Sequence, residues 1–186
     1  MGDANIRLER KGAVAVVTLD RPGRLHAFND VMFDVLEGVA RELAASLPRA
    51  IVLTAAGERS FSAGFDVHPD NPMVQRIVDS VSTKDEAPAR AAIAHIRRAV
   101  DAFVSLPVPI IAAVNGHAYA GGLEIALACD FVYAAEHARF ALTEVTLGIM
   151  PGLMGTQNLP RAVGVRRAKE IILTGAPFSA IDGLAW

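Results

Sequence analysis

The sequence predicts an α/β fold in which helices cover the faces of a sheet. A short apolar strand, a glycine-containing loop and a helix follow one another about three times along the chain. The 186 residues are enough for one domain with a hydrophobic core and too few for two domains of ordinary size. With 52% hydrophobic and 20% charged residues, the composition is that of a globular protein. We therefore expect a single domain over residues 1–186.

The first half of the chain contains five predicted regular segments. In the helix predicted over residues 31–47, apolar residues recur every three or four positions and so share one face. Asn29 or Asp30 can cap the start of this helix, and Pro48 ends it. The five segments are strands 5–10, 13–19 and 50–55 and helices 31–47 and 87–106.

Two stretches between these segments are irregular in the sequence. Residues 56–66 are expected to form a loop that leads directly into a helix. Residues 68–88 are polar, are interrupted by prolines and have a mixed periodicity. We expect residues 68–88 to form a mobile segment that is partly helical.

The second half of the chain alternates strands and helices between glycine-rich turns. Ser179 and Asp182, three positions apart, are typical of a capping box at a helix start. The chain then ends with three residues, 184–186, that have no expected packing partner, which indicates that a C-terminal helical part is truncated or missing. The predicted elements are strands 109–114, 131–135 and 138–142 and helices 123–130, 164–175 and one beginning near 179.

Composition argues against several classes of partner. The net charge is −2 and no basic block occurs, so nucleic acid is not expected to bind. The single cysteine, Cys129, excludes an internal disulfide and a CxxC metal site, and it favours a reducing, cytoplasmic location. Residues 1–12 contain neither an apolar signal region nor a myristoylation motif, and residues 106–114 are too short an apolar run to cross a bilayer. No membrane partner is expected.

Several familiar motifs are incomplete in this chain. Ser62 lacks the preceding glycine of a nucleophile elbow, and the loop from Gly116 lacks the lysine of a P-loop. No GxGxxG sequence occurs. The histidines show no metal-ligand spacing and are expected to be structural or solvated. They are His26, His68, His95, His117 and His137. We expect no metal and no separate cofactor.

Two loops share one layout and suggest a common task. "FSAGFD" follows strand 50–55, and "GHAYAGGLE" follows strand 109–114. Each loop contains small residues that let a ligand approach backbone N–H groups. Two such loops facing each other can direct two N–H donors at one oxygen, which is an oxyanion hole. Alternatively, the glycines only allow tight turns, and spacing alone leaves both interpretations open.

Two glutamates interrupt apolar surroundings near these loops. Glu124 lies in the first turn of an apolar helix, and Glu144 lies in "ALTEVTLGIMPG". Two carboxylates at one pocket perturb each other's pKa, which suits acid/base chemistry. Each can instead be a structural acid that is capped or paired, as a carboxylate near a helix N-terminus often is. The sequence does not show whether the two side chains meet.

Three segments of the chain resemble the signature segments of one family, the enoyl-CoA hydratase/isomerase (crotonase) superfamily. They are "FSAGFDV", "AAVNGHAYAGGLEIALACD" and "EVTLGIMPGLMGTQNLPRAVG", in the family's order and spacing. The resemblance runs from about residue 6 to the end of the chain. It implies a crotonase-like spiral of ββα repeats that binds acyl-CoA thioesters and, at full length, self-associates as a trimer or hexamer. The family's C-terminal trimerisation helices are absent from this sequence.

The resemblance also implies roles for individual residues. The oxyanion-hole amides correspond to Phe65 and Gly121, and the amide that helps to hold the reacting water corresponds to Gly152. Glu124 and Glu144 correspond to the pair that adds water across the 2,3 double bond of an enoyl-CoA thioester. Coenzyme A, as part of the substrate, is expected to contact the side chain of Arg24 and the backbone of the "SAGFDV" turn. The contacting residues of that turn are Ala63, Gly64, Asp66 and Val67.

Some residues depart from the family pattern. Phe65 replaces a small residue, and His26 stands where many members have asparagine. Leu153 and Met154 replace smaller residues and are expected to narrow the acyl pocket. These departures leave the acyl group open.

Four functions remain as alternatives at this point. The first is an enoyl-CoA hydratase. The second is a sibling reaction on the same scaffold, namely isomerisation, dehydration or decarboxylation of an acyl-CoA. The third is a non-catalytic protein that binds acyl-CoA or RNA. The fourth is a serine hydrolase that uses Ser62.

Overall fold

The computed structural model describes residues 5–186. The N-terminal residues 1–4, where a lipidation motif was sought in the sequence, lie outside the described residues. The larger of two sheets has the strand order β1-β2-β3-β5-β7, with β1 antiparallel to β2 and the others parallel. Its strands are β1 (Ile6–Lys11), β2 (Val14–Leu19), β3 (Ala50–Ala55), β5 (Ile110–Val114) and β7 (Phe131–Ala134).

The smaller sheet has the order β4-β6-β8-β9, and only β9 runs antiparallel to its neighbour. Strands β4 and β6 each have three residues and were not predicted, because both lie within glycine-containing loop sequences. The strands are β4 (Ser60–Ser62), β6 (His117–Tyr119), β8 (Arg139–Ala141) and β9 (Phe178–Ser179).

The two sheets are built by one repeated path of the chain. Strand β3 joins the large sheet, β4 joins the small sheet, and helices follow; β5, β6 and α4 repeat this order, as do β7, β8 and the helices after them. Each repeat of this path therefore contributes one strand to each sheet. The predicted α/β fold and its spiral of ββα repeats are confirmed.

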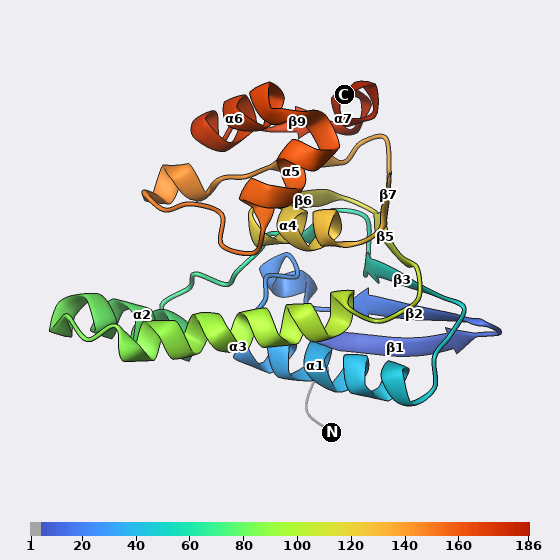
Figure 1. Ribbon diagram of the computed structural model, residues 1–186, viewed down its shortest axis with the longest axis horizontal. Coiled ribbons are helices and arrows are strands. Elements are labelled where there is room, and N and C mark those ends of the chain that lie inside the picture. The colour runs from blue at the N-terminus through green and yellow to red at the C-terminus, as the bar shows by residue number, and fades with distance from the viewer. Residues whose placement is uncertain (1–4) are drawn as a thin grey trace.

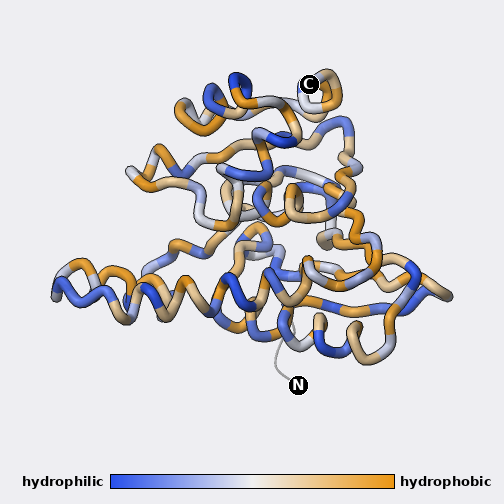
Figure 2. The backbone as a smooth tube through the Cα atoms, in the orientation of Figure 1, coloured by the Kyte–Doolittle hydropathy of each residue, from blue (hydrophilic) through white to orange (hydrophobic). Residues whose placement is uncertain are grey.

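Three helices accompany the first half of the chain, and α1 and α3 lie side by side along the large sheet (Figure 1). Hydrophobic and hydrophilic residues alternate along both helices, so each buries one face (Figure 2). Asn29 caps α1 as expected, since its Oδ1 accepts a hydrogen bond from the Met32 amide at 3.1 Å. The helices are α1 (Asp30–Ala45), α2 (Pro72–Thr83) and α3 (Ala87–Val104).

The segment 68–88 is more regular than the sequence indicated. It contains α2, which Asn71 caps through a hydrogen bond from the Met73 amide. Its helical character is confirmed, and its mobility stays a prediction. The expectation that residues 56–66 lead directly into a helix is wrong, because β4 intervenes and the next helix begins only at Pro72.

Helices of the second half gather on the side of the molecule away from the N-terminus (Figure 1). The helix α5 was not predicted, since glycines surround its start and Pro160 lies inside it. The elements are α4 (Gly121–Ala128), α5 (Gly155–Val163), α6 (Val165–Thr174) and α7 (Ala180–Ala185), with 3₁₀ turns η1 (Pro22–Arg24) and η2 (Glu144–Leu147).

The end of the chain is packed better than expected. The capping box is present, because the Ser179 side chain accepts from the Asp182 amide and the Asp182 carboxylate accepts from the Ser179 amide, both at 3.0 Å. The ring of Trp186 lies 5.1 Å from that of Phe178, and the Arg167 guanidinium lies 4.4 Å above it. The expectation that nothing packs Trp186 is therefore wrong.

The hydrophobic core lies between the sheets and the helices that cover them. Its largest fully buried side chains include Phe28, Phe33, Phe61 and Phe103. Phe28 and Phe33 stack with ring centroids 5.2 Å apart, which joins the loop before α1 to that helix. Among the described residues, no helix is long and apolar enough to cross a membrane.

Candidate active site

The two glycine-containing turns meet at Gly64 and Gly121. A β-carbon added to Gly64 would stand 2.7 Å from the Gly121 nitrogen, and Gly64 has a φ of +92°. A β-carbon on Gly122 would stand 2.3 Å from the Ser62 carbonyl oxygen. Contacts this short are not possible for a real side chain, so these glycines are needed for the approach of one turn to the other. Tight turning alone does not explain them.

The Phe65 amide is oriented by an isolated bridge to Phe28. The Phe28 amide donates to the Gly64 carbonyl at 2.7 Å, and the Asp66 amide donates to the Phe28 carbonyl at 2.8 Å. The Gly64 carbonyl and the Phe65 N–H belong to one planar trans peptide and so point in opposite directions. The Phe65 N–H therefore points away from Phe28 and is left open by the bridge.

The Gly121 amide opens the first turn of α4. An amide at this helical position has no partner within its own helix. A β-carbon on Gly121 would lie 3.6 Å from the Phe65 nitrogen, so the two amides are neighbours. Ala120, the residue before Gly121, has a φ of +49°, a strained conformation for alanine of the kind found at functional sites. The turns thus bring together the two donors that the sequence predicted.

Glu124 is buried, with 2% of its surface exposed, and is held by the start of α5. Its Oε1 accepts hydrogen bonds from the amides of Leu153 and Gly155, both at 2.8 Å. Burial raises the pKa of Glu124, and the amides of Gly155, Leu153 and Gly152 oppose that rise. The sequence reading missed Leu153 and Gly155 as partners. No signal for them was available, because the donors are backbone amides and the helix that follows, α5, was not predicted.

Glu144 opens η2 and is 7% exposed. Its Oε2 has no hydrogen-bond partner among residues 5–186. Burial, and next the negative charge of Glu124, raise the pKa of Glu144 to about 7. The charge of Glu124 therefore reaches Glu144, although the two residues come from different elements.

Gly152, the predicted water-binding residue, lies beside the Glu124 carboxylate. Its amide lowers the pKa of Glu124. Gly152 is exposed, and a β-carbon added to it would meet no described atom within 4 Å. Open space therefore lies next to Gly152.

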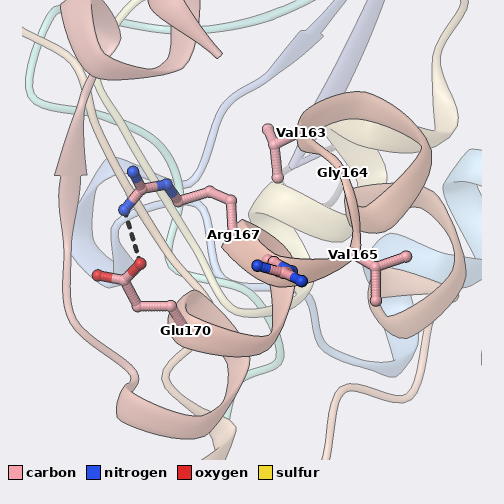
Figure 3. A pocket seen from close by; sticks show the side chains of 6 residues that line it. Val163, Gly164, Val165, Arg167 and Glu170 are labelled. Carbon is pink, nitrogen blue, oxygen red and sulfur yellow. Dashed lines mark hydrogen bonds and ion pairs between the residues drawn. The ribbon is translucent and has the colours of Figure 1, made fainter.

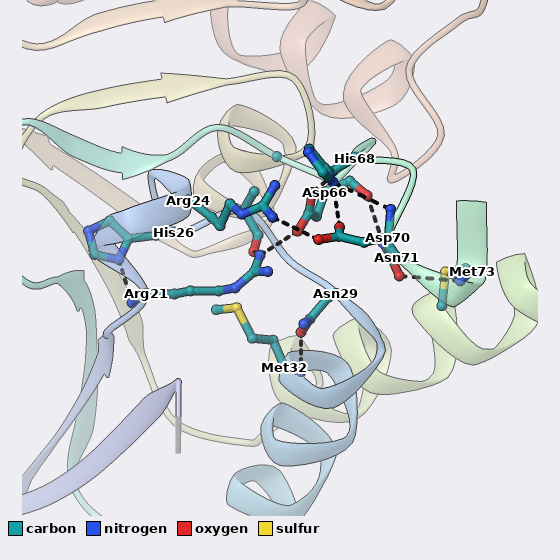
Figure 4. A network of polar contacts seen from close by, with 12 residues as sticks. Arg21, Arg24, His26, Asn29, Met32, Asp66, His68, Asp70, Asn71 and Met73 are labelled. Carbon is teal, nitrogen blue, oxygen red and sulfur yellow. Dashed lines mark hydrogen bonds and ion pairs between the residues drawn. The ribbon is translucent and has the colours of Figure 1, made fainter. Parts of the chain in front are cut away.

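The predicted coenzyme A contacts are partly occupied by the protein itself. Arg24 donates to the Asp70 carboxylate at 2.9 Å, within the polar network in Figure 4. The Asp66 side chain is 6% exposed and pairs with Arg21 at 2.6 Å. Both backbone groups of Asp66 are also used, since its carbonyl accepts from Asn71 at 2.6 Å and its amide donates to Phe28. Asp66 therefore has no free polar group for a ligand.

The other residues of the turn keep some free groups. The Ala63 amide donates to the Leu25 carbonyl, and the Gly64 amide donates to the Ser62 hydroxyl. No hydrogen bond among residues 5–186 uses the carbonyl oxygens of Ala63 or Phe65. Val67 is 58% exposed. These carbonyls and Val67 are the groups that the turn can offer to a ligand.

His26 and Ser62 have structural roles. His26 is 2% exposed with a φ of +55°, a region that histidine and asparagine both tolerate. Its Nδ1 accepts from the Arg21 amide, which leaves Nε2–H to donate to the Ala56 carbonyl, and burial lowers the pKa of the ring. The Ser62 hydroxyl is fully buried and donates to the His26 carbonyl rather than to an imidazole. This arrangement speaks against a serine nucleophile.

Two hollows lie apart from the paired glutamates. One of about 450 Å³ surrounds the start of α6, where Arg167 is engaged by Glu170 at 2.6 Å (Figure 3). The other, of about 690 Å³, is an apolar groove between α4, α5, β7 and α7. Neither is lined by the two acids or the two open amides. Residues 5–186 contain no cluster of three His, Cys, Asp or Glu side chains suited to a metal.

Comparisons with known proteins identify the family of the chain. Residues 9–186 match the family described as Enoyl-CoA hydratase/isomerase. The chain is 39% identical over 184 residues to the short-chain-enoyl-CoA hydratase of Clostridium acetobutylicum, covering 97% of this chain and 65% of that protein. It is 38% identical over 182 residues to the (E)-benzylidenesuccinyl-CoA hydratase of Thauera aromatica, covering 97% and 66%.

A solved structure gives the same result for the fold. The enoyl-CoA hydratase from Bacillus anthracis superposes with a TM-score of 0.83 at 37% identity, covering 97% of this chain and 67% of that one. The chain spans about 65% of the length of the curated relatives it matches. With its α/β crotonase fold and its family match over nearly the whole sequence, the chain belongs to the enoyl-CoA hydratase/isomerase family.

Proposed function

We propose that this site hydrates the 2,3 double bond of an enoyl-CoA thioester. The observation that carries the proposal is the pair of buried carboxylates: Glu124, on the same turn of α4 as the open Gly121 amide, and Glu144, whose pKa is raised by burial and then by the charge of Glu124. Two relatives with 38–39% identity are named as enoyl-CoA hydratases of different acyl groups, which supports this reaction class.

The amides of Phe65 and Gly121 stabilise the enolate. Hydration moves the alkene electron pair onto the thioester oxygen, and two fixed N–H donors stabilise the charge that develops there. Removing one such donor typically lowers the rate by about 10²–10³-fold. Coenzyme A is held at the entrance to the site by Arg24 and by the free backbone groups of Ala63, Phe65 and Val67.

The two glutamates divide the proton transfers. Three backbone amides favour the ionised form of Glu124, whereas only its own backbone amide does so for Glu144, and the pKa of Glu144 is raised to about 7. Glu124 takes a proton from a water whose oxygen bonds to the β-carbon. Glu144 then gives a proton to the α-carbon of the enolate. Return of the proton from Glu124 to Glu144 completes the net addition of one water.

The reaction is tested through the absorbance of the conjugated enoyl group. Wild-type protein is expected to remove this absorbance from crotonyl-CoA or a longer enoyl-CoA. Glu124→Gln and Glu144→Gln are each expected to lower the rate by at least about 10²-fold, the usual contribution of a positioned acid or base. Glu42→Gln, on the exposed face of α1, serves as the control. No loss of absorbance with any enoyl-CoA would contradict the proposal.

Isomerisation of a 3-enoyl-CoA is the second candidate. A single acid with a pKa near neutrality, as Glu144 has, can carry a proton between two carbons of the substrate. Retention of Glu124 favours hydration, because hydration needs a base for the water as well. Product analysis with a 3-enoyl-CoA separates a shifted double bond from a hydroxyacyl product. Tight acyl-CoA binding without turnover would instead favour a non-catalytic role.

Assembly and location follow from the family and stay proposals. We propose that the protein self-associates as a trimer or hexamer at full length and works in the cytoplasm. Light scattering on the full-length protein tests the first, and fractionation of cells tests the second.

A further inference from the structure

One guanidinium nitrogen, Nη1 of Arg21, holds two segments of the chain together (Figure 4). It donates to the Ala27 carbonyl at 2.8 Å and to Oδ2 of Asp66 at 2.6 Å. The Arg21 side chain is 18% exposed and that of Asp66 is 6% exposed, so this ion pair is shielded from water. Ala27 and Asp66 are the neighbours of Phe28 and Phe65, the two residues of the isolated bridge.

Asp66 is fixed from its other side as well. Its Oδ1 accepts from the His68 amide at 3.1 Å, and its carbonyl accepts from the Asn71 side chain at 2.6 Å. Asn71 also caps α2. Arg21 is therefore linked, through Asp66 and Asn71, to the start of α2, so the segment that it holds is itself fixed to a helix.

The bridge matters because it sets the direction of the Phe65 N–H. The Phe28 amide holds the Gly64 carbonyl, and that carbonyl lies on the same rigid peptide as the Phe65 N–H. If the segments carrying Phe28 and Phe65 shift apart, this peptide is free to turn. Donors stabilise an oxyanion only when they already point at the place where the charge develops.

We propose that Arg21 and Asp66 are positioning residues for the oxyanion hole, acting through the Phe28–Phe65 bridge. The inference rests on the proposed function, because it assigns these residues to the same acyl-CoA site. Neither side chain touches the substrate. Their contribution is to keep the Phe65 amide aimed at the thioester oxygen.

Another ion pair of the chain offers a matched control. Arg76 in α2 pairs with Asp30 at the start of α1, also at 2.6 Å. This pair joins two helices and contacts neither residue of the bridge. Arg76→Met therefore removes a guanidinium–carboxylate contact of equal length without touching the Phe65 amide.

The kinetic test compares Arg21→Met, Asp66→Asn and Arg76→Met in folded protein. Arg21→Met is expected to lower kcat for enoyl hydration by about 10–100-fold with KM within about threefold, since a small misplacement of a catalytic group has effects of this size. Asp66→Asn keeps the shape of the side chain, and a smaller loss in the same direction is expected. Arg76→Met is expected to stay within about twofold of wild type.

A second measurement reports on the oxyanion hole without turnover. Acetoacetyl-CoA, a 3-ketoacyl thioester, forms an enolate whose absorbance shows how strongly the site stabilises it. Wild-type protein is expected to lower the pH at which the bound thioester enolises. Arg21→Met and Asp66→Asn are each expected to weaken the stabilisation of the bound enolate by at least about tenfold. Arg76→Met is expected to leave it unchanged.

The outcomes separate the two proposals. If wild-type protein stabilises the enolate but hydrates no enoyl-CoA, the proposed function fails and the variants still test Arg21. If Arg21→Met does not fold, as circular dichroism would show, Asp66→Asn decides. The positioning role would be overturned if folded Asp66→Asn, or folded Arg21→Met, stabilised the enolate and turned over as well as the wild-type protein does. It would also be overturned if the wild-type protein stabilised no enolate.

Discussion

Glu144 differs from Glu124 in what surrounds its carboxylate. Backbone amides reach Glu124 from the start of α5, whereas Oε2 of Glu144 has no partner among the described side chains and amides. A buried acid with few donors keeps its proton to a higher pH than a solvated one. At the scale of single residues, this contrast makes the two acids chemically unequal.

The raised pKa of Glu144 predicts a pH-dependent stability. Above about pH 4.5 the unfolded chain ionises this residue freely, while the folded chain holds the proton until about pH 7. The folded state therefore binds more protons in this window, and the residue's contribution to stability falls as pH rises through it. We expect Glu144→Gln to stabilise the protein by about 2 kcal/mol at pH 8 and little at pH 4.5.

Thermal unfolding at the two pH values checks this prediction. A gain of 2 kcal/mol corresponds to roughly 5 °C in Tm for a chain of this size. Glu42→Gln, at an exposed position, is expected to show no such difference. A Tm gain for Glu144→Gln that is equal at both pH values would contradict the assigned ionisation.

Gly155 predicts a second effect at the residue scale. A β-carbon there would stand 2.8 Å from Oε1 of Glu124, so Gly155→Ala must displace the carboxylate. We expect a loss of about 10–100-fold in kcat with little change in stability. In Gly38→Ala the new carbon meets nothing within 4 Å, and the rate of this control should stay within about twofold. Equal rates for the two variants would show that Glu124 tolerates displacement.

At the scale of elements, α6 lies behind the segment that carries Glu144. Its C-cap, Gly175, has a φ of +65°, and a β-carbon there would stand 3.0 Å from Val145, the residue after Glu144. Its N-cap, Gly164, has a φ of +78°, and a β-carbon there would meet nothing within 4 Å. Both caps have a positive φ, but Gly175 is left-handed helical whereas Gly164, with a ψ of 155°, is in a region open essentially only to glycine, and the two also differ in what they touch.

This difference predicts different effects of the same substitution. Gly164→Ala and Gly175→Ala should each lower stability by at least about 1 kcal/mol, because both put alanine at a positive φ. Only Gly175→Ala presses on η2, so only it should lower kcat, by about 5–10-fold, from the displaced Glu144. Denaturant unfolding and initial rates on both variants check the prediction. A comparable loss of kcat in Gly164→Ala would point to a general effect of strain.

Elements with a clear apolar run, period or cap could be predicted from the sequence, and those without one could not. The helix α1 has a cap at Asn29 and a full apolar face, and its period is unambiguous. The strands β4 and β6 have three residues each, and their existence depends on pairing with partners far away in the chain. The helix α5 was hidden by Pro160, which local rules treat as a break.

At the scale of the whole molecule, the large sheet is buried at its centre and exposed at one edge. Leu53 in β3 is 1% exposed, and Val132 in the edge strand β7 is 42% exposed. We expect Leu53→Ala to cost about 2–5 kcal/mol of unfolding free energy and Val132→Ala less than about 1 kcal/mol. Urea unfolding of both variants measures the difference. Equal losses would mean that the edge of the sheet is covered in solution.

Site residues could be predicted from the sequence only where the residue type itself is unusual for its surroundings. Glu124 and Glu144 stand out as acids in apolar sequence, and the glycines mark the turns. The donors to Glu124 are backbone amides, which any residue carries, so Leu153 gave no signal. The Arg21–Asp66 pair joins residues 45 positions apart, and only the folding of two loops brings them together.

The element α4 has a consequence for how the chemistry can change. Gly121, the proposed donor to the thioester oxygen, and Glu124 lie on one helical turn, while Glu144 comes from a separate segment after β8. Holding a reactive intermediate and deciding its fate are thus tasks of different parts of the chain. Exchanging the residue at position 144 would leave the enolate equally well held and would redirect where its electrons go. A scaffold divided in this way can acquire a new reaction by single substitutions without rebuilding its binding site.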